Sequence, residues 1–235
     1  MEGASVPHEF PTFFDTVVLA VMAKVPGATA VKSRLHPSLT AEQATELYRC
    51  FLLDRLDALA GLAEIAPVVA FTPPSARARM VELAPREFRL IPQRGADLGA
   101  RLSNLLTGLL RDGHPGAIAV DSDSPTLPMD YVVEGARALE NDAADLVLGP
   151  CSDGGYYFVG LRAPRPALFE EIPWSTAEVL RLTLEKARRL GLRLHLLPLW
   201  FDVDTESDLR RLHEQLVTAG TGPPRTLAFV RALYR

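Results

Sequence analysis

Acidic residues that could bind a divalent cation occur at two distant places in the chain. Asp121 and Asp123 directly follow an apolar segment, residues 117–120, and Asp202 and Asp204 come much later. Carboxylates just beyond a buried strand are costly unless a positive charge lies between them. Such hard oxygen ligands favour Mg²⁺ or Mn²⁺. The sequence therefore predicts a metal site in which Asp123 is joined by Asp202 and Asp204, with Asp121 as a further candidate.

Both acidic segments also have a simpler interpretation, which the sequence leaves open. Asp123 could cap the helix that is expected after it. The later segment could be a surface turn in which Thr205 caps a helix with Asp208 in its first turn. Capping accounts for Asp208 but leaves Asp202 and Asp204 available to a ligand.

A loop with three cations follows the first apolar segment, residues 17–22. Lys24, Lys32 and Arg34 lie on either side of Gly27. Loop amides with lysine and arginine can bind a phosphate group, which arginine can hold through two hydrogen bonds. The loop lacks the Gly-Lys-Ser/Thr sequence of a Walker loop. We expect these four residues to bind nucleotide phosphates, although a solvated basic loop would have the same composition.

The segment 92–99 has residues that suit a nucleobase. The amide of Gln93 offers a donor and an acceptor to a base edge, and Gly99 would permit close approach of the backbone. We therefore place Gln93 and Gly99 in the nucleotide-binding set. An ordinary loop is the alternative for this segment.

The segment 149–155 is rich in glycine and is expected to contact the acceptor substrate. Asp153 could accept hydrogen bonds from sugar hydroxyls, and the ring of Tyr156 could stack on a ligand. A tight hairpin turn is the alternative here, and Ser175 as a helix cap beside a packed Trp174 is the alternative further on. The residues predicted to bind the acceptor are Asp153, Gly154, Gly155, Tyr156 and Trp174.

Composition excludes several classes of protein. The 235 residues have a formal net charge of −4, which argues against a general nucleic-acid binder. Two cysteines, Cys50 and Cys151, are too few for a disulfide framework. No run reaches the roughly 18 apolar residues of a membrane span, and residues 1–14 lack the basic start of a secretory signal. We expect a cytoplasmic monomer or homodimer without nucleic-acid or membrane partners.

Apolar segments that suit strands alternate with segments of helical period along the chain. This alternation predicts a three-layer α/β/α fold with a mostly parallel sheet. We expect a loose leader over residues 1–14, a single catalytic domain over 15–219, and a tail over 220–235 that ends in a short helix. Expected strands are 17–22, 66–71, 88–91, 117–120, 145–148, 156–161 and 192–197, and expected helices are 40–56, 75–83, 100–111, 128–141, 176–190 and 206–219. Ligands of such sheets bind beyond the carboxyl ends of the strands, where the polar loops above lie.

Six motifs, spread over residues 17–212, carry a resemblance to a known family. They are Ala23-Lys24-x-Pro26-Gly27 with Val31-Lys32-Ser33-Arg34-Leu35, Gln93-Arg94-Gly95-x-Asp97-Leu98-Gly99, Asp121-Ser122-Asp123-Ser124-Pro125, Gly149-Pro150-x-x-Asp153-Gly154-Gly155-Tyr156-Tyr157, Trp174-Ser175-Thr176 and Asp202-Val203-Asp204-Thr205 with Asp208-Leu209. Together they resemble the GT-A-fold group of small bacterial proteins described as glycosyltransferase-like or nucleotide-diphospho-sugar transferases. The resemblance implies a GT-A fold and a nucleotide or nucleotide sugar as substrate.

A more distant similarity, to 2-phospho-lactate guanylyltransferase and the molybdenum cofactor nucleotidyltransferases, rests on the Lys-x-Arg-Leu loop and the late Asp-x-Asp-Thr segment. It implies that Lys24, Lys32 and Arg34 hold a diphosphate or triphosphate, and that Asp123 and Asp204 hold Mg²⁺ or Mn²⁺. These expectations make the protein a metal-dependent nucleotidyltransferase or glycosyltransferase that joins a nucleoside triphosphate or nucleotide sugar to a small acceptor.

The residues expected to act in catalysis are Lys32, Arg34, Asp123 and Asp153. The cations would stabilise the negative charge that develops on the phosphates, and Asp153 would lie beside the attacking acceptor. The alternative is a non-catalytic nucleotide-sensing or partner-binding module. Clustered acidic loops count against that alternative, since a simple binder does not need mutually repelling carboxylates.

Overall fold

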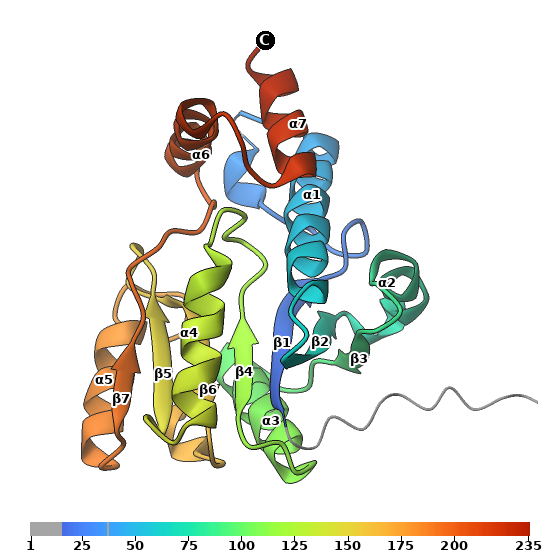
Figure 1. Ribbon diagram of the computed structural model, residues 1–235. Helices are drawn as coiled ribbons and strands as arrows, with labels where there is room; N and C mark the ends of the chain where they lie inside the picture. Colours follow the sequence, from blue (N-terminus) through green and yellow to red (C-terminus); the bar gives the residue numbers. More distant parts are fainter. Residues whose placement is uncertain (1–15, 37) are drawn as a thin grey trace, which may run out of the picture.

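The computed structural model describes residues 16–36 and 38–235 of the chain (Figure 1). Its seven strands form one sheet in the order β3-β2-β1-β4-β6-β5-β7, in which β6 alone runs antiparallel to its neighbours. The strands are β1 (Val17–Lys24), β2 (Ile65–Thr72), β3 (Arg89–Pro92), β4 (Ala117–Val120), β5 (Leu146–Pro150), β6 (Tyr156–Leu161) and β7 (Leu194–Leu196).

Seven α-helices and three short 3-10 helices accompany the sheet in the described residues. The α-helices are α1 (Ala41–Ala60), α2 (Arg77–Leu83), α3 (Leu98–Arg111), α4 (Met129–Glu140), α5 (Val179–Arg189), α6 (Glu206–Ala219) and α7 (Pro224–Leu233). The 3-10 helices are η1 (Ser33–Leu35), η2 (Pro74–Ala76) and η3 (Pro166–Leu168).

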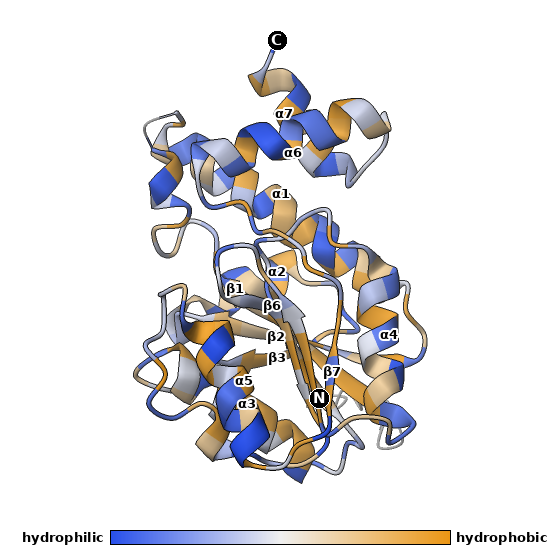
Figure 2. Cartoon of the chain, turned by 90° about the vertical axis from the view of Figure 1, so that its left-hand side faces the viewer, coloured by the Kyte–Doolittle hydropathy of each residue, from blue (hydrophilic) through white to orange (hydrophobic). Residues whose placement is uncertain are grey.

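Two hydrophobic cores, one on each face of the sheet, produce the three layers. Val17, Leu19 and Val21 of β1 point into the core shared with α1 and α4, whereas Val18 and Ala20 point into the core shared with α3 and α5. All five are almost completely buried, as expected for a strand covered on both faces. Figures 1 and 2 show α1 and α4 on one side of the sheet and α3 and α5 on the other. The predicted α/β/α architecture is confirmed.

A third hydrophobic cluster joins α6 and α7 to α1, beyond the edge of the sheet at which β1 ends (Figure 2). Phe51 of α1, Leu212 of α6 and Val230 of α7 are fully buried in it. The carboxylate of Asp54 in α1 accepts hydrogen bonds from the first backbone amides of α7, Arg225 N–H and Thr226 N–H. The short helix expected within residues 220–235 is therefore α7, and it is tied to α1.

Most expected elements occur within a few residues of their expected bounds, but two proposed helix caps are wrong. Asp123 does not cap a helix, because α4 begins six residues later, with Pro128 at its N-cap. Ser175 has φ 67°, a left-handed conformation, and α5 begins only at Val179. By contrast, Thr205 does cap α6 in a reciprocal capping box with Asp208, as expected.

The expected leader, residues 1–14, lies outside the described residues. In the part of the chain that is described, no helix combines the length and apolar character needed to cross a lipid bilayer. The cytoplasmic location and the monomeric or dimeric state remain predictions.

The parallel topology determines where the polar loops meet. β1 ends at Lys24, β4 ends at Val120 just before Asp121, and β5 ends at Pro150, all at one edge of the sheet. Because β6 is antiparallel, it begins at that same edge with Tyr156. Loops that are far apart in sequence are therefore brought together at the carboxyl edge.

Two glycines in helices provide a matched test of this packing. A Cβ added at Gly135 in α4 would lie 2.5 Å from the buried ring of Phe158, whereas one at Gly108 in α3 would meet nothing within 4 Å. Gly135→Ala should lower the free energy of unfolding by about 1–3 kcal/mol through overpacking. Gly108→Ala should raise it by about 0.5–1 kcal/mol through helix propensity. Urea denaturation measures both, and equal effects would contradict the assigned core.

Candidate functional site

A cavity of about 520 Å³ opens at the carboxyl edge of the sheet. We call it the edge cavity. It is lined by residues from the loops after β1, β4 and β5, from the start of β6, and from the segment before α6. The predicted site residues that line it are Lys24, Lys32, Arg34, Asp123, Asp153, Gly155, Tyr156, Trp174, Asp202 and Asp204. The structure thus brings together most of the predicted residues.

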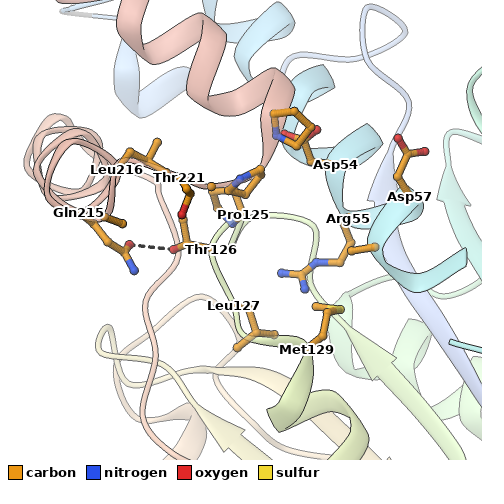
Figure 3. Close-up of a pocket in the computed structure, with 15 residues that line it drawn as sticks. Asp54, Arg55, Asp57, Pro125, Thr126, Leu127, Met129, Gln215, Leu216 and Thr221 are labelled. Carbon is orange, nitrogen blue, oxygen red and sulfur yellow. Dashed lines mark hydrogen bonds between the residues drawn. The ribbon is translucent and has the colours of Figure 1, made fainter. Parts of the chain in front are cut away.

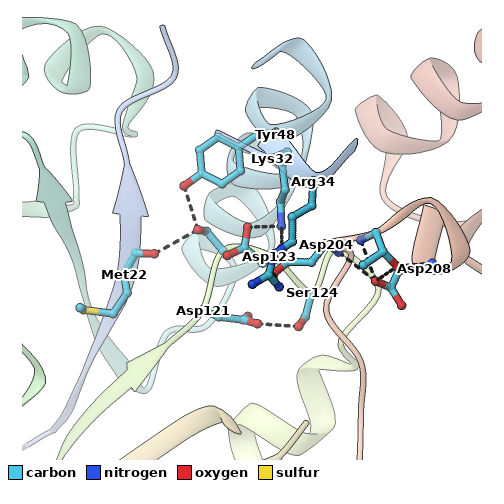
Figure 4. A network of polar contacts seen from close by, with 11 residues as sticks. Met22, Lys32, Arg34, Tyr48, Asp121, Asp123, Ser124, Asp204 and Asp208 are labelled. Atoms are coloured by element: carbon cyan, nitrogen blue, oxygen red, sulfur yellow. Dashed lines mark hydrogen bonds and ion pairs between the residues drawn. The ribbon is translucent and has the colours of Figure 1, made fainter. Parts of the chain in front are cut away.

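Lys32 is the centre of the charge network in this cavity (Figure 4). Its Nζ lies 2.6 Å from Asp123 Oδ1 and 2.8 Å from Asp204 Oδ1, although 172 residues separate Lys32 from Asp204. The Lys32 side chain is 3% exposed, while both carboxylates are more than a third exposed toward the cavity. Arg34 adds a longer ion pair, 3.8 Å from Asp204 Oδ2, on the solvent side.

The backbone of Lys32 is in the left-handed region, with φ 50° and ψ 37°, directly before η1. This conformation is uncommon outside glycine, and such strain occurs where a side chain must be aimed precisely. Burial on its own would lower the pKa of the Lys32 amine, but the carboxylates of Asp123 and Asp204 raise it above its usual value. Conversely, burial would raise the pKa of Asp204, but Lys32 lowers it. Lys32 and Asp204 are therefore both charged at neutral pH.

A chain of hydroxyl groups holds the ends of β1 and β4 in place beside this network. Tyr48 Oη accepts a hydrogen bond from the Lys24 amide at 2.9 Å, and Ser122 Oγ donates to the Met22 carbonyl at 3.0 Å. Since the Ser122 proton is used in that bond, Tyr48 Oη donates to Ser122 Oγ at 2.9 Å. Figure 4 shows Tyr48 reaching from α1 toward this point.

Asp121 is one of the carboxylates that line the edge cavity. Its Oδ2 accepts a hydrogen bond from Ser124 Oγ at 2.6 Å, and its Oδ1 is buried without a partner in the described residues. Burial raises its pKa to about 7; Arg55 opposes this shift, and the nearby Asp123 adds to it. A buried carboxylate oxygen without a donor is costly, which is the situation expected of a group kept for function.

A second set of possible metal ligands lines the same cavity. The set consists of Cys151, Asp153 and Asp202, whose thiol sulfur and carboxylate oxygens lie within 4.8 Å of one another, one atom being counted for each residue. The pKa of Asp202 is raised to about 6, mainly by burial and further by the negative charges of Asp204 and Asp153. Burial also raises the pKa of the Cys151 thiol, so this group stays protonated and is a poor ligand. The carboxylate oxygens that remain suit a hard cation such as Mg²⁺ or Mn²⁺.

The carboxylates of the predicted metal site therefore have two different kinds of neighbour. Asp123 and Asp204 share the amine of Lys32, whereas Asp202 lies beside Asp153. No other described residue donates a hydrogen bond to the Asp202 side chain. Asp202 is the carboxylate that is most available to an added cation.

A smaller cavity of about 300 Å³ adjoins the edge cavity and shares Lys24, Lys32 and Asp123 with it. Gln93 lies in its wall. Its Nε2 donates to the carbonyls of Ala70 at 2.7 Å and Ala23 at 3.3 Å. Both amide protons are thus directed at backbone, and Oε1 remains as an acceptor. We call this space the side cavity.

Three predicted glycines do not line either cavity. A Cβ at Gly99 would lie 2.2 Å from Trp174 Nε1, so Gly99 permits close packing of α3 against the indole of Trp174. The corresponding position at Gly27 faces the guanidinium of Arg79, and at Gly154 the carbonyl of Ala177. The close approach at Gly99 is thus to a side chain of the protein.

The alternatives left open for the loops are also resolved. Residues 149–155 do form a tight hairpin turn between β5 and β6, closed by Cys151 N–H donating to the Gly155 carbonyl at 3.0 Å. Asp153 Oδ1 accepts from the Gly155 amide within this turn, and both residues still line the edge cavity. The basic loop is not simply solvated, because Lys32 is buried.

Sequence reasoning missed several residues around the site. Tyr48 was expected only as part of a helix, and its bonds to β1 and β4 depend on how α1 packs on the sheet. Arg101 lines the side cavity one turn along α3 from Leu98, which lines both cavities. The available signal for Arg101 was a charged residue in the first turn of the helix that follows Gln93 in the sequence.

Comparison with known proteins places the chain among proteins of similar architecture. Residues 55–176 match the model of a family described as "Uncharacterized protein conserved in bacteria (DUF2064)". The chain has no match among curated proteins.

Solved structures give closer detail. A protein from Desulfovibrio desulfuricans G20, provisionally assigned as a nucleotide-diphospho-sugar transferase, has 30% identity and a TM-score of 0.83, covering 92% of this chain and 97% of its own. CMP:2-keto-3-deoxy-manno-octonic acid synthetase, complexed with CTP, has 12% identity and a TM-score of 0.57, covering 87% and 99%. 4-Diphosphocytidyl-2C-methyl-D-erythritol synthase from Anaerococcus prevotii DSM 20548 has 9% identity and a TM-score of 0.58, covering 86% and 97%. The resemblance expected from the sequence motifs is confirmed.

The raised pKa of Asp121 gives a testable dependence of stability on pH. The folded protein holds this proton up to about pH 7, whereas an unfolded aspartate loses it near pH 3.8. The wild type therefore loses stability as the pH rises between these two values, by about 1.4 kcal/mol for each pH unit. Asp121→Asn should become progressively more stable than the wild type from pH 4 to about pH 7 and gain little more by pH 8, as measured by urea denaturation with a chelator present. A difference that does not change with pH would contradict this assignment.

Proposed function

The chain belongs to the family described as "Uncharacterized protein conserved in bacteria (DUF2064)", and we propose that it is a metal-dependent transferase of nucleotides or nucleotide sugars. Its 30% identity to a protein provisionally assigned as a nucleotide-diphospho-sugar transferase supports this proposal. The observation that carries the proposal is the placement of Lys32 between Asp123 and Asp204 at the base of the edge cavity. Lys24 and Arg34 stand at its rim.

The charges of this cavity suit an anionic ligand that arrives with a cation. Lys24, Lys32 and Arg34 can pair with the oxygens of a diphosphate or triphosphate. Five aspartates line the same cavity and would repel these phosphates if no cation were present. They are Asp121, Asp123, Asp153, Asp202 and Asp204. Phosphates bound by the basic residues therefore require a cation on the aspartates, and that cation in turn is neutralised by the phosphates.

We assign the cation to Asp202 with Asp123 and Asp204, the set predicted from the sequence. In the described residues the ligand atoms that already cluster within 4.8 Å are those of Cys151, Asp153 and Asp202. A cation bound by Asp202 must therefore draw Asp123 or Asp204 toward it. Mg²⁺ or Mn²⁺ held there would neutralise charge on the phosphates and polarise the phosphorus under attack. Lys32 holds the two carboxylates that it pairs with in fixed positions before any substrate binds. Such prior orientation reduces the reorganisation needed when charge develops in the transition state.

The more specific activity that we favour is nucleotidyl transfer. An oxygen of an acceptor phosphate attacks the α-phosphorus of a nucleoside triphosphate, a new P–O bond forms, and the bond to the leaving pyrophosphate breaks. Lys32 and Arg34 stabilise the negative charge that accumulates on the phosphates and on the departing pyrophosphate. The support is that the late Asp-Val-Asp-Thr segment places Asp204 in contact with Lys32 and Arg34, two of the three cations of the basic loop.

The two neighbouring spaces suit the remaining parts of the substrates. The side cavity would take the nucleobase, with Gln93 Oε1 accepting from an N–H group on the base edge. The acceptor would bind in the part of the edge cavity lined by Asp153, Tyr156 and Trp174. Asp153 can accept hydrogen bonds from hydroxyl groups there, and the ring centroids of Tyr156 and Trp174 lie 6.3 Å apart. Trp174 is fixed by its packing on Gly99.

A screen for ligands and products tests this function. Nucleoside triphosphates and nucleotide sugars, each with Mg²⁺ or Mn²⁺, are screened for an increase in melting temperature, because a ligand of the folded state stabilises it by mass action. The nucleotides that bind are then incubated with sugar phosphates. Asp202→Asn and Asp123→Asn should each reduce kcat/KM by about 100-fold or more and remove the metal-dependent part of nucleotide binding.

Asp130→Asn provides the matched control, because Asp130 is an exposed carboxylate on α4 away from the cavities. It should retain full turnover. Release of pyrophosphate supports nucleotidyl transfer, and release of nucleoside diphosphate would replace it with glycosyl transfer. Binding without any turnover, in the wild type and in all variants, would indicate a nucleotide-sensing module and refute the enzymatic proposal.

A further inference from the structure

A third cavity, of about 590 Å³, lies between α1, the segment that leads into α4, and the linker from α6 to α7 (Figure 3). We call it the helix cavity. No residue proposed above to bind nucleotide, metal or acceptor lines it. Its walls are largely apolar, with Ala58, Leu127, Met129 and Leu216 among the residues that line it.

One charged group points into this apolar space. Arg55 extends from α1 toward Leu127 and Met129, as Figure 3 shows, and is 3% exposed. Within the described residues, its guanidinium makes a single hydrogen bond, from Nη2 to the carbonyl of Ser124. Its Nε is buried and has no partner. A guanidinium has five N–H donors, so most of the hydrogen-bonding capacity of Arg55 is unused.

The acidic residues nearby do not supply hydrogen-bond acceptors for Arg55. The charge of Asp121 acts on Arg55, but no ion pair or hydrogen bond joins the two side chains in the described residues. Asp54 and Asp57, which also line the cavity, are both paired with Nη1 of Arg225, at 3.2 Å and 2.7 Å. Asp54 accepts further hydrogen bonds from the backbone amides that start α7. Among the described residues, no carboxylate forms an ion pair with Arg55 within 4.0 Å.

A buried guanidinium is costly when most of its N–H donors lack an acceptor, and Arg55 keeps such donors beside an apolar cavity. We propose that the helix cavity is a binding site for a small organic anion, a compact apolar molecule whose carboxylate or phosphate group pairs with Arg55. The hydrogen bond to the Ser124 carbonyl fixes the guanidinium in advance, and the planar fork suits both anionic groups. The apolar walls accept the rest of the ligand.

The test uses three aromatic probes at constant ionic strength. Benzoate carries a carboxylate, phenyl phosphate carries a phosphate, and benzamide is a neutral analogue of benzoate. Benzoate or phenyl phosphate should raise the melting temperature of the full chain in a saturable way, and benzamide should bind at least tenfold more weakly. The tighter of the two anions identifies the preferred anionic group.

Three variants connect the binding to this cavity. Arg55→Met should weaken binding of the anion at least tenfold; because it also removes the positive charge that acts on Asp121, its melting temperature without ligand is measured alongside. Ala58→Phe, at an exposed position of α1 that lines the cavity, should block entry even if Arg55→Met does not fold. Arg34→Ala removes a cation from the edge cavity and should leave the binding unchanged.

Binding of the anions that is unaffected by Ala58→Phe would overturn the proposal. So would equal binding of benzamide and benzoate, loss of binding in Arg34→Ala, or the absence of any saturable shift in the wild type. The helix cavity and the edge cavity share no residue, and Ala58→Phe changes no charge, so this variant separates binding at the helix cavity from the proposed transferase activity.

Discussion

The site depends on a single buried amine that pairs with two carboxylates from distant parts of the chain. Lys32 comes from the loop after β1, Asp123 from the loop after β4, and Asp204 from the segment before α6. Without this cation, several carboxylates at one edge of the sheet would repel one another. With it, the protein can fold around an acidic cavity before any external cation is present.

The sheet and the helices packed on it hold the loops that carry these three residues in fixed positions. β1 and β4 are neighbours in the centre of the sheet and are covered by cores on both faces, so the loops after them begin from rigid positions. Tyr48 and Ser122 connect the ends of these two strands through hydroxyl hydrogen bonds. Phe51 packs in the cluster that attaches α6 and α7 to α1, and its ring lies 5.9 Å from Lys32 Nζ. The site is thus built on rigid elements.

The sequence was sufficient to predict the layers and most of the site, because both follow from simple rules. Apolar segments alternating with helical periods imply a parallel sheet, and the carboxyl ends of parallel strands lie at one edge. That rule predicts that Asp123 and Asp204 lie close together. It could not indicate that Lys32 would be buried between them, since this depends on a left-handed backbone at one residue. The partner that Gly99 accommodates could not be identified either, because Trp174 is distant from it in sequence.

A double-mutant cycle between Lys32 and Asp204 tests the dependence of the site on the buried amine most directly. The free energies of unfolding of the wild type, Lys32→Met, Asp204→Asn and the double variant are measured in urea with a chelator present. If the amine and the carboxylate stabilise each other in the ligand-free protein, the coupling energy should be about 1–3 kcal/mol. A coupling energy near zero would mean that Lys32 does not hold the acidic loops together, and the central role of this amine in the site would be refuted.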